Sequence, residues 1–270
     1  MPRAQLPDIA LYYERGGRAS GPPVLLIGGS GGDLRQEPSM LAGPLAATFD
    51  QLAYDQRGLG RSDKPESAYT MADYGRDGAG LLDAVGWDRC AVVGISFGGM
   101  VAQELALLVP HRVTRLVLCC TSSGGAGGSS YPLPELDGLP DDERLARSLS
   151  LMDSRWDASW QSANPGIVDL MRRRTAVGAG DAEATGGARR QLEARAAHDT
   201  HARLRHLTMP TLVCAGRHDA IAPLANAEAL VAQIPGAVLQ VFDGGHAFLF
   251  QDPGAWPAIV GFLADGQPST

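Results

Sequence analysis

The sequence has few cysteines, and this scarcity excludes two classes of protein. Only four cysteines occur among 270 residues, and Cys119 and Cys120 are neighbours. Four are too few for a disulfide scaffold, and no Cys or His pair has the spacing of a zinc site. We therefore expect reduced thiols, no bound metal and a cytoplasmic location.

The chain also lacks an excess of basic residues and any long apolar run. Lys and Arg number 23 against 30 Asp and Glu, a net charge of −7, which disfavours a nucleic-acid binder. No run of about 20 apolar residues is present, and no apolar segment of a secretory signal follows Met1. We expect a soluble protein, monomeric or homo-oligomeric, whose partner is a small molecule and neither nucleic acid nor membrane.

Short apolar segments alternate with helical patterns along most of the chain. Unbroken apolar strands between helices are typical of a mostly parallel sheet that is buried on both faces. Segment 8–14 is predicted to form an antiparallel hairpin at the sheet edge with the strand that follows it. The other predicted strands cover residues 24–27, 51–54, 90–94, 113–120, 211–215 and 237–242, and the helices residues 71–85, 98–109, 223–234 and 253–263.

Residues 122–206, called the insertion below, interrupt this alternation. They begin with a Gly/Ser-rich tract and continue with three charged helical patterns. We predict a core of residues 1–121 and 207–270, a helical cap of residues 122–206, and a hinge at residues 124–128. The predicted helices of the insertion cover residues 141–152, 164–177 and 181–197.

The clearest motif is Gly-Ile-Ser-Phe-Gly at residues 94–98, between a predicted strand and a predicted helix. A sharp strand-to-helix turn of this kind lifts a serine hydroxyl above the sheet and requires small residues on both sides. The helix that follows directs its first N–H groups toward an oxyanion formed there. Ser96 is therefore the candidate nucleophile, and the Phe97 N–H is one candidate oxyanion donor.

Two residues that follow later strands complete the candidate site. Asp219 and His246 each come just after a predicted strand, and the chain order Ser, Asp, His is that of one class of serine hydrolase. We assign His246 as general base and Asp219 as the residue that orients its ring. Asp243 and Asp252 are rivals for the acidic position, because both lie close to His246 in the sequence.

With these motifs, the sequence resembles the α/β-hydrolase family over nearly its whole length. Residues 55–62, Asp-Gln-Arg-Gly-Leu-Gly-Arg-Ser, match its D-x-R-G-x-G-x-S turn, whereas Gly28 replaces the histidine that many members carry. Residues 31–35 and 98–103 are most similar to the 3-oxoadipate enol-lactonase branch. The resemblance implies an α/β-hydrolase fold with a cap, no cofactor, and a second oxyanion donor at the Ser30 N–H.

The expected reaction is hydrolysis of a small ester or lactone through an acyl-enzyme. Carbon–carbon bond hydrolysis of vinylogous diketones and perhydrolysis use the same triad and stay open, as does a ligand receptor or signalling protein on this fold. The residues predicted to contact substrate are Gly29, Trp156, Trp160 and Phe248; the two tryptophans could instead anchor the insertion.

Two charged patterns could bind a ligand or could simply be solvated surface. Arg172, Arg173 and Arg174 could attract a substrate carboxylate, but a solvated helix face is the commoner explanation for such a run. His198 and His201 could bind a metal, yet no third ligand is evident nearby, so a solvated helix end is expected.

Overall fold

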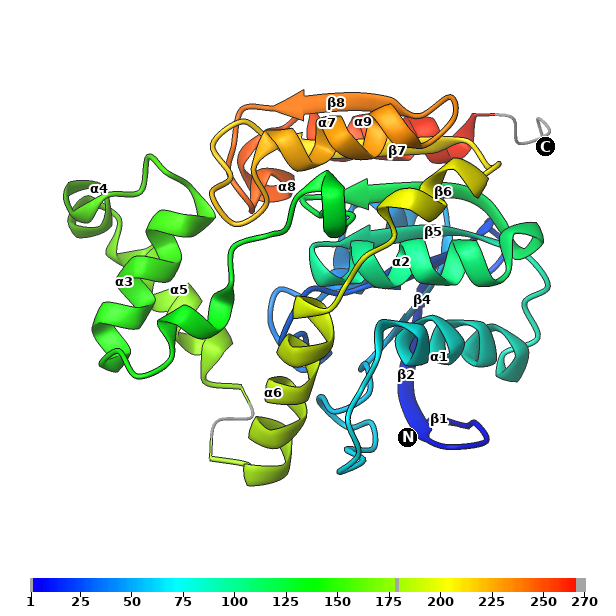
Figure 1. The fold of residues 1–270 in the computed structure, drawn as a ribbon, viewed down its shortest axis with the longest axis horizontal. Helices are drawn as coiled ribbons and strands as arrows, with labels where there is room; N and C mark the ends of the chain where they lie inside the picture. Colours follow the sequence, from blue (N-terminus) through cyan, green and yellow to red (C-terminus); the bar gives the residue numbers. More distant parts are fainter. Residues whose placement is uncertain (1, 178–179, 266–270) are drawn as a thin grey trace.

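A computed structural model describes residues 2–177 and 180–265, and its centre is an eight-stranded sheet (Figure 1). The strand order is β1-β2-β4-β3-β5-β6-β7-β8, and every pair from β4 to β8 is parallel. The mostly parallel sheet predicted from the apolar runs is thus confirmed. The strands are β1 Arg3–Gln5, β2 Ala10–Gly17, β3 Pro23–Ile27, β4 Asp50–Tyr54, β5 Cys90–Ile95, β6 Val113–Cys119, β7 Thr211–Gly216 and β8 Val238–Phe242.

Helices cover both faces of the sheet. One apolar cluster joins the sheet to α1 (Met71–Ala84), α2 (Phe97–Leu108) and α7 (Leu224–Gln233). A second cluster on the other face includes residues of α8 (Phe248–Gln251) and α9 (Ala255–Ala264). Because both faces are covered, most residues of β3 to β7 are buried on either side of the sheet.

The N-terminal edge differs from its prediction in one respect. Strand β2 is antiparallel, as expected, but its partners are β1 and β4. Strand β3, which follows it in the chain, pairs instead with β4 and β5. The hairpin predicted between residues 8–14 and the next strand is therefore wrong, because the chain crosses past β4 after Gly17 and the real hairpin is formed by β1 and β2.

The insertion contributes four helices next to the carboxyl ends of the parallel strands (Figure 1). They are α3 (Asp141–Met152), α4 (Ala158–Ala163), α5 (Pro165–Thr175) and α6 (Ala182–Ala196). Helix α4 was not predicted; the Asp157 side chain caps it by accepting a hydrogen bond from the Trp160 N–H. Within residues 2–177 and 180–265, no helix has the length and apolar character needed to span a bilayer.

The glycine-rich start of the insertion is packed. Gly124 forms an isolated antiparallel bridge with Asp199, and the Ser123 carbonyl accepts a hydrogen bond from the Thr200 N–H at 2.8 Å. A Cβ on Gly124 would lie 1.8 Å from the His198 carbonyl oxygen, so only glycine fits. These contacts do not support the hinge predicted at residues 124–128.

Candidate active site

Ser96 occupies a strained turn between β5 and α2. Its φ of 56° and ψ of −118° are unusual for a residue with a side chain, and its N–H donates to the Cys119 carbonyl at 2.8 Å. A Cβ on Gly98 would lie 2.1 Å from the Ile27 carbonyl oxygen, and one on Gly94 2.4 Å from that of Gly98. The two glycines are therefore required by close backbone packing, as the motif predicted.

The structure brings Ser96, His246 and Asp219 together in a line. Ser96 Oγ lies 2.9 Å from His246 Nε2, and His246 Nδ1 lies 2.7 Å from Asp219 Oδ2. The His246 side chain is 13% exposed and that of Asp219 is fully buried. Both distances are within hydrogen-bonding range, so a proton can pass from the hydroxyl to the ring while the carboxylate fixes the ring's tautomer.

Asp219 occupies the acidic position, and its two rivals do not. Its Oδ1 accepts hydrogen bonds from the N–H groups of Ile221 and Ala222, each at 2.8 Å. Asp243 Oδ1 instead pairs with the Arg155 guanidinium at 2.9 Å. Asp252 accepts from the N–H groups of residues 243 and 254. The position of Asp219 is thus set by its own loop, independently of the histidine.

The loop that carries His246 rests on the end of α3. The His246 N–H donates to the Met152 carbonyl at 2.5 Å, and a Cβ on Gly245 would lie 2.0 Å from the same carbonyl oxygen. The loop of Asp219 contacts this segment too, since the Ala220 N–H donates to the Leu151 carbonyl at 3.1 Å. One segment of the insertion therefore supports both loops.

A buried carboxylate, Asp153, strengthens this support. It accepts hydrogen bonds from the Arg155 guanidinium and backbone N–H and from Gln251 Nε2, at 2.8–2.9 Å. Gln251 Oε1 in turn accepts from the Gly245 N–H at 2.8 Å. Burial tends to raise the pKa of Asp153, but the hydrogen bonds from Arg155 and Gln251 outweigh it and lower that pKa. Asp153 is thus held as a charged, fully paired group.

The loop after β3 lies beside the nucleophile. A Cβ on Gly29 would lie 3.4 Å from that of Ser96, so Gly29 borders the serine; its contact with substrate stays a prediction. The Ser30 N–H has no hydrogen-bond acceptor among the described residues. Phe97 is the first residue of α2, and such N–H groups have no partner inside a helix. Both predicted oxyanion donors are therefore free to bind an oxygen.

Two contacts fix the loop after β3. Gln56 Nε2, in the turn at residues 55–62, donates to the Gly28 carbonyl at 2.8 Å. The Gly31 N–H donates to Oε1 of Gln191, a fully buried residue of α6, at 2.9 Å. Glycine at position 28, where many family members have histidine, thus leaves a loop that is held from the core on one side and from the insertion on the other.

Three of the residues predicted to contact substrate stack on other aromatic side chains. Trp156 and Trp160 stack on each other with ring centroids 4.4 Å apart, and Trp160 belongs to α4, which lies on the side of the insertion away from the strands (Figure 1). Phe248 is fully buried and stacks on Phe242 in the core, 5.1 Å between centroids. All three side chains thus have aromatic partners, and their contact with substrate stays a prediction.

The arginine run on α5 does not reach the site either. Arg172 is 53% exposed and pairs with Asp142 and Asp169. Arg174 donates to the Glu37 carbonyl. The arrangement is that of a helix face paired with nearby acceptors.

Among the described residues, no group of three His, Cys, Asp or Glu side chains is placed to hold a metal ion. His198 is buried, and neither ring nitrogen has a hydrogen-bond partner. His201 Nδ1 lies 3.3 Å from the Ser123 hydroxyl. The two histidines thus have separate surroundings, and His198 is not the solvated residue that the sequence suggested.

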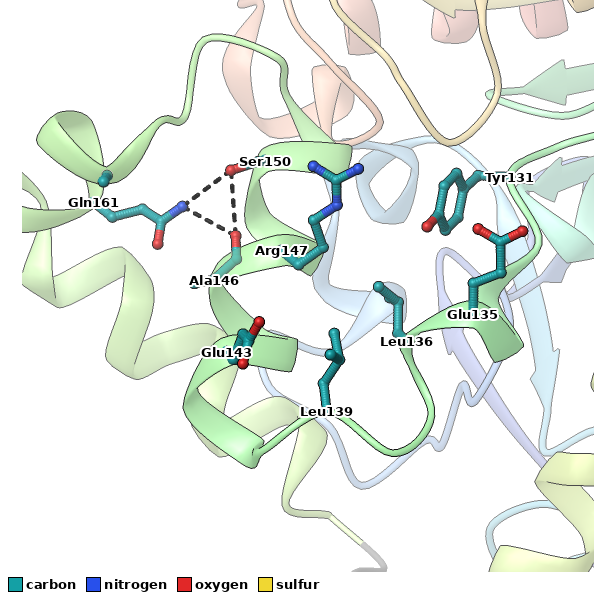
Figure 2. Close-up of a pocket in the computed structure, with 10 residues that line it drawn as sticks. Tyr131, Glu135, Leu136, Leu139, Glu143, Ala146, Arg147, Ser150 and Gln161 are labelled. Carbon is teal, nitrogen blue, oxygen red and sulfur yellow. Dashed lines mark hydrogen bonds between the residues drawn. The ribbon is translucent and has the colours of Figure 1, made fainter.

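A pocket of about 420 Å³ opens within the insertion, between α3, α4 and the segment 131–139 (Figure 2). Its lining includes Tyr131, Leu136, Arg147 and Gln161, but none of Ser96, Asp219 and His246. Tyr131 connects this pocket to the catalytic edge, because its N–H donates to the Ile221 carbonyl at 2.7 Å.

Comparisons with known proteins agree on the family and the fold. A family model described as the alpha/beta hydrolase fold matches residues 22–253. The chain is 34% identical to a putative carbamate hydrolase RutD of Variovorax paradoxus, covering 94% of this chain and 96% of that protein. It is 32% identical to a 2-hydroxymuconate semialdehyde hydrolase of a Pseudomonas species, covering 92% and 89%. The solved enol-lactonase of Burkholderia xenovorans superimposes with a TM-score of 0.81 at 25% identity, covering 98% and 100%.

Proposed function

Because the chain belongs to the α/β-hydrolase family, we propose that it hydrolyses a small ester or lactone through an acyl-enzyme on Ser96. The protein is a hydrolase, since the family model and relatives that cover more than nine-tenths of the chain agree. The observation that carries the finer proposal is the continuous line from Ser96 Oγ through the His246 ring to Asp219 Oδ2. Such a line is the geometry that activates a serine hydroxyl.

The first step uses the hydrogen bond between serine and histidine. The Ser96 hydroxyl donates its proton to His246 Nε2 as its oxygen attacks the substrate carbonyl. Asp219 Oδ2 accepts the Nδ1–H of His246 and stabilises the imidazolium that forms. The strained backbone of Ser96 holds the hydroxyl ready for attack, so little reorganisation is needed.

The free N–H groups of Ser30 and Phe97 then stabilise the tetrahedral oxyanion. One such donor typically contributes a factor of about 10²–10³ to kcat. The imidazolium protonates the leaving alcohol or the ring oxygen, and water, deprotonated by His246, releases the acyl group. The insertion acts as a cap that limits bulk water at this edge of the sheet.

The names of two relatives favour other reactions, the hydrolysis of a carbon–carbon bond or of a carbamate. The Pseudomonas relative, 32% identical, is named for a semialdehyde whose hydrolysis breaks a carbon–carbon bond, and the Variovorax relative for a carbamate. The same three side chains serve ester, carbamate and carbon–carbon substrates. We propose ester or lactone hydrolysis first, because the match to the solved enol-lactonase extends over the full length of that enzyme.

A substrate panel tests the proposal. Small esters, lactones, carbamates and vinylogous diketones are incubated with the wild type and with Ser96→Ala. We expect multiple turnovers on an ester or lactone and a loss of about 10³-fold or more in kcat for Ser96→Ala. Unchanged ester hydrolysis by Ser96→Ala contradicts the mechanism. Turnover of a diketone alone favours the carbon–carbon reaction instead.

A further inference from the structure

The loop that carries His246 has little means of holding its own shape. The two residues before the histidine are Gly244 and Gly245, which have no side chains to pack or to form hydrogen bonds. Their surroundings leave no room for side chains: a Cβ on Gly244 would lie 2.8 Å from Gln251 Oε1, and one on Gly245 2.0 Å from the Met152 carbonyl oxygen. The His246 ring is therefore placed by groups beyond this glycine pair.

Two acceptors hold this loop by its backbone N–H groups. The Met152 carbonyl accepts from the His246 N–H at 2.5 Å, and Gln251 Oε1 accepts from the Gly245 N–H at 2.8 Å. Gln251 is the last residue of α8, which follows the histidine, and its partly buried side chain reaches back to the loop. The bond at Gly245 is made by a side chain, so it is the one that a substitution can change.

Both ends of the Gln251 amide are used, and each end has a partner of fixed character. Nε2 donates to Asp153 Oδ2 at 2.8 Å, while Oε1 accepts the Gly245 N–H. The charged Asp153 can only accept hydrogen bonds, and a backbone N–H can only donate one. Residue 251 must therefore offer a donor to the insertion and an acceptor to the loop. An amide does both, whereas a carboxylate or an apolar side chain does not.

The hydrogen bond from Gln251 acts directly beside the triad. Gly245 precedes His246, whose Nε2 lies 2.9 Å from Ser96 Oγ and whose Nδ1 lies 2.7 Å from Asp219 Oδ2. The ring must meet both partners at once, and hydrogen bonds weaken steeply when their length or angle departs from the ideal. A small shift of the loop therefore impairs proton transfer from the serine.

We propose that Gln251 is a positioning residue for the hydrolysis: its amide fixes the loop of His246 against Asp153 of the insertion, so that the ring reaches both of its partners. This rests on the proposed function, which makes His246 the base. The hydrogen bonds of Gln251 go to Asp153 and to the Gly245 backbone, so its effect on the reaction passes through the histidine. Loss of the amide lowers kcat and leaves substrate binding as it is.

Two single variants test this role by steady-state kinetics. Gln251→Leu removes both hydrogen bonds, and kcat should fall about tenfold with KM changed by less than about twofold. Gln251→Glu keeps the acceptor for the Gly245 N–H but sets a carboxylate against Asp153, and should lower kcat at least as much. The matched control is Gln240→Glu, which adds the same charge on β8 ahead of the loop and should leave kcat within about twofold of the wild type.

A double variant reverses donor and acceptor across the same contact. In Asp153→Asn with Gln251→Glu, the new amide at position 153 donates to the new carboxylate at position 251, which still accepts the Gly245 N–H. We expect its kcat to lie within about threefold of the wild type and above that of either single variant. Losses that simply add in the double variant overturn the positioning role, because a matched pair then has no value for the loop.

A spectroscopic signal separates this inference from the proposed function. With ¹⁵N-labelled histidine, NMR detects the Nδ1–H of His246 that Asp219 accepts, and His246→Ala identifies its resonance by loss. We expect the resonance in the wild type and in the double variant, and its broadening in Gln251→Leu, because a mobile ring exchanges this proton with water faster.

The two failures are then distinct. If no ester or lactone is hydrolysed yet the His246 resonance responds to Gln251→Leu as expected, the proposed function fails and the positioning role stands. If Ser96 is required for hydrolysis but Gln251→Leu keeps the wild-type kcat and resonance, the positioning role is overturned and the proposed function stands. Should Gln251→Leu not fold, Gln251→Glu and the double variant carry the same comparison.

Discussion

The insertion contacts the catalytic edge in two regions that differ in how their polar groups are satisfied. At the end of α3, the Asp153 carboxylate accepts hydrogen bonds from Arg155 and Gln251, and the neighbouring backbone carbonyls bind the loops of His246 and Asp219. On the buried face of α6, Gln191 and Arg195 keep donors that no group of the described chain accepts. The buried polar groups of the first region are paired within the described chain, whereas some of those on α6 are not.

This difference indicates which region positions the catalytic loops. A fully paired buried network is rigid, because moving any member leaves another unsatisfied, so it suits residues that must hold a histidine ring in place. A buried unpaired charge is costly to the fold. We therefore infer that the α3 end holds the catalytic loops in place.

The largest expected effect is at Asp219, whose loop the end of α3 supports. Asp219→Asn keeps the shape of the side chain but favours the wrong tautomer of His246, and kcat should fall by about 10³–10⁴-fold. Asp243→Asn is the matched control: it is exposed, pairs with Arg155 rather than His246, and should change kcat by less than about threefold. Steady-state kinetics on one ester measure both variants. Equal losses of kcat would make Asp243 a candidate again for the acidic residue of the triad.

A smaller effect is expected at Asp153, which acts through the His246 loop. Asp153→Asn leaves donors of Arg155 and Gln251 facing an amide, and should cost about 2 kcal/mol of stability. We expect kcat to fall about tenfold with KM nearly unchanged, because the ring rather than the substrate loses its position. Thermal unfolding and kinetics measure the two effects. A change confined to KM would show that the α3 end binds substrate instead of holding the ring.

The smallest effect is in the pH dependence of stability, which distinguishes the two regions. Burial lowers the pKa of His198, which follows α6, to about 4. Between about pH 6.5 and about pH 4 the unfolded chain binds a proton that the folded one does not, so stability falls with falling pH, by about 1 kcal/mol at pH 5.5. The lowered pKa of Asp153 acts with the same sign but only below its ordinary value of 3.8.

Replacing the histidine isolates this contribution. His198→Phe should flatten the stability profile between pH 6.5 and 4, measured by urea unfolding at each pH. The exposed His206 provides the control, since His206→Gln should leave the profile as it is. A profile that His198→Phe does not change would show that this histidine is solvated in solution.

Much of the fold was predictable because the parallel strands are buried on both faces. Their unbroken apolar runs locate β3 to β8 within one or two residues, whereas the three-residue β1 has too little pattern to be recognised. The partner of β2 was missed because strand pairing depends on how the chain crosses the sheet. Helix α4, with six residues, is set by its Asp157 cap and local packing rather than by periodicity.

The site residues also fall into those that the sequence predicts and those that it does not. Ser96, Asp219 and His246 follow strand ends and a motif, so their meeting could be predicted from the sequence. Asp153 belongs to the insertion, where no motif marks it, and its surroundings arise only when α3 reaches the strand ends. The spacing of Gln191 and Arg195 places them on one helix face, but the sequence alone does not tell which face is buried.

The most direct test of the account is covalent labelling of the nucleophile. The protein is treated with an organophosphonate ester, digested, and analysed by mass spectrometry, with His246→Ala in parallel. One phosphonyl group per chain, located on Ser96 and formed far more slowly in the variant, is the predicted result. A label on another residue, or an unmodified Ser96 after prolonged treatment, would contradict it.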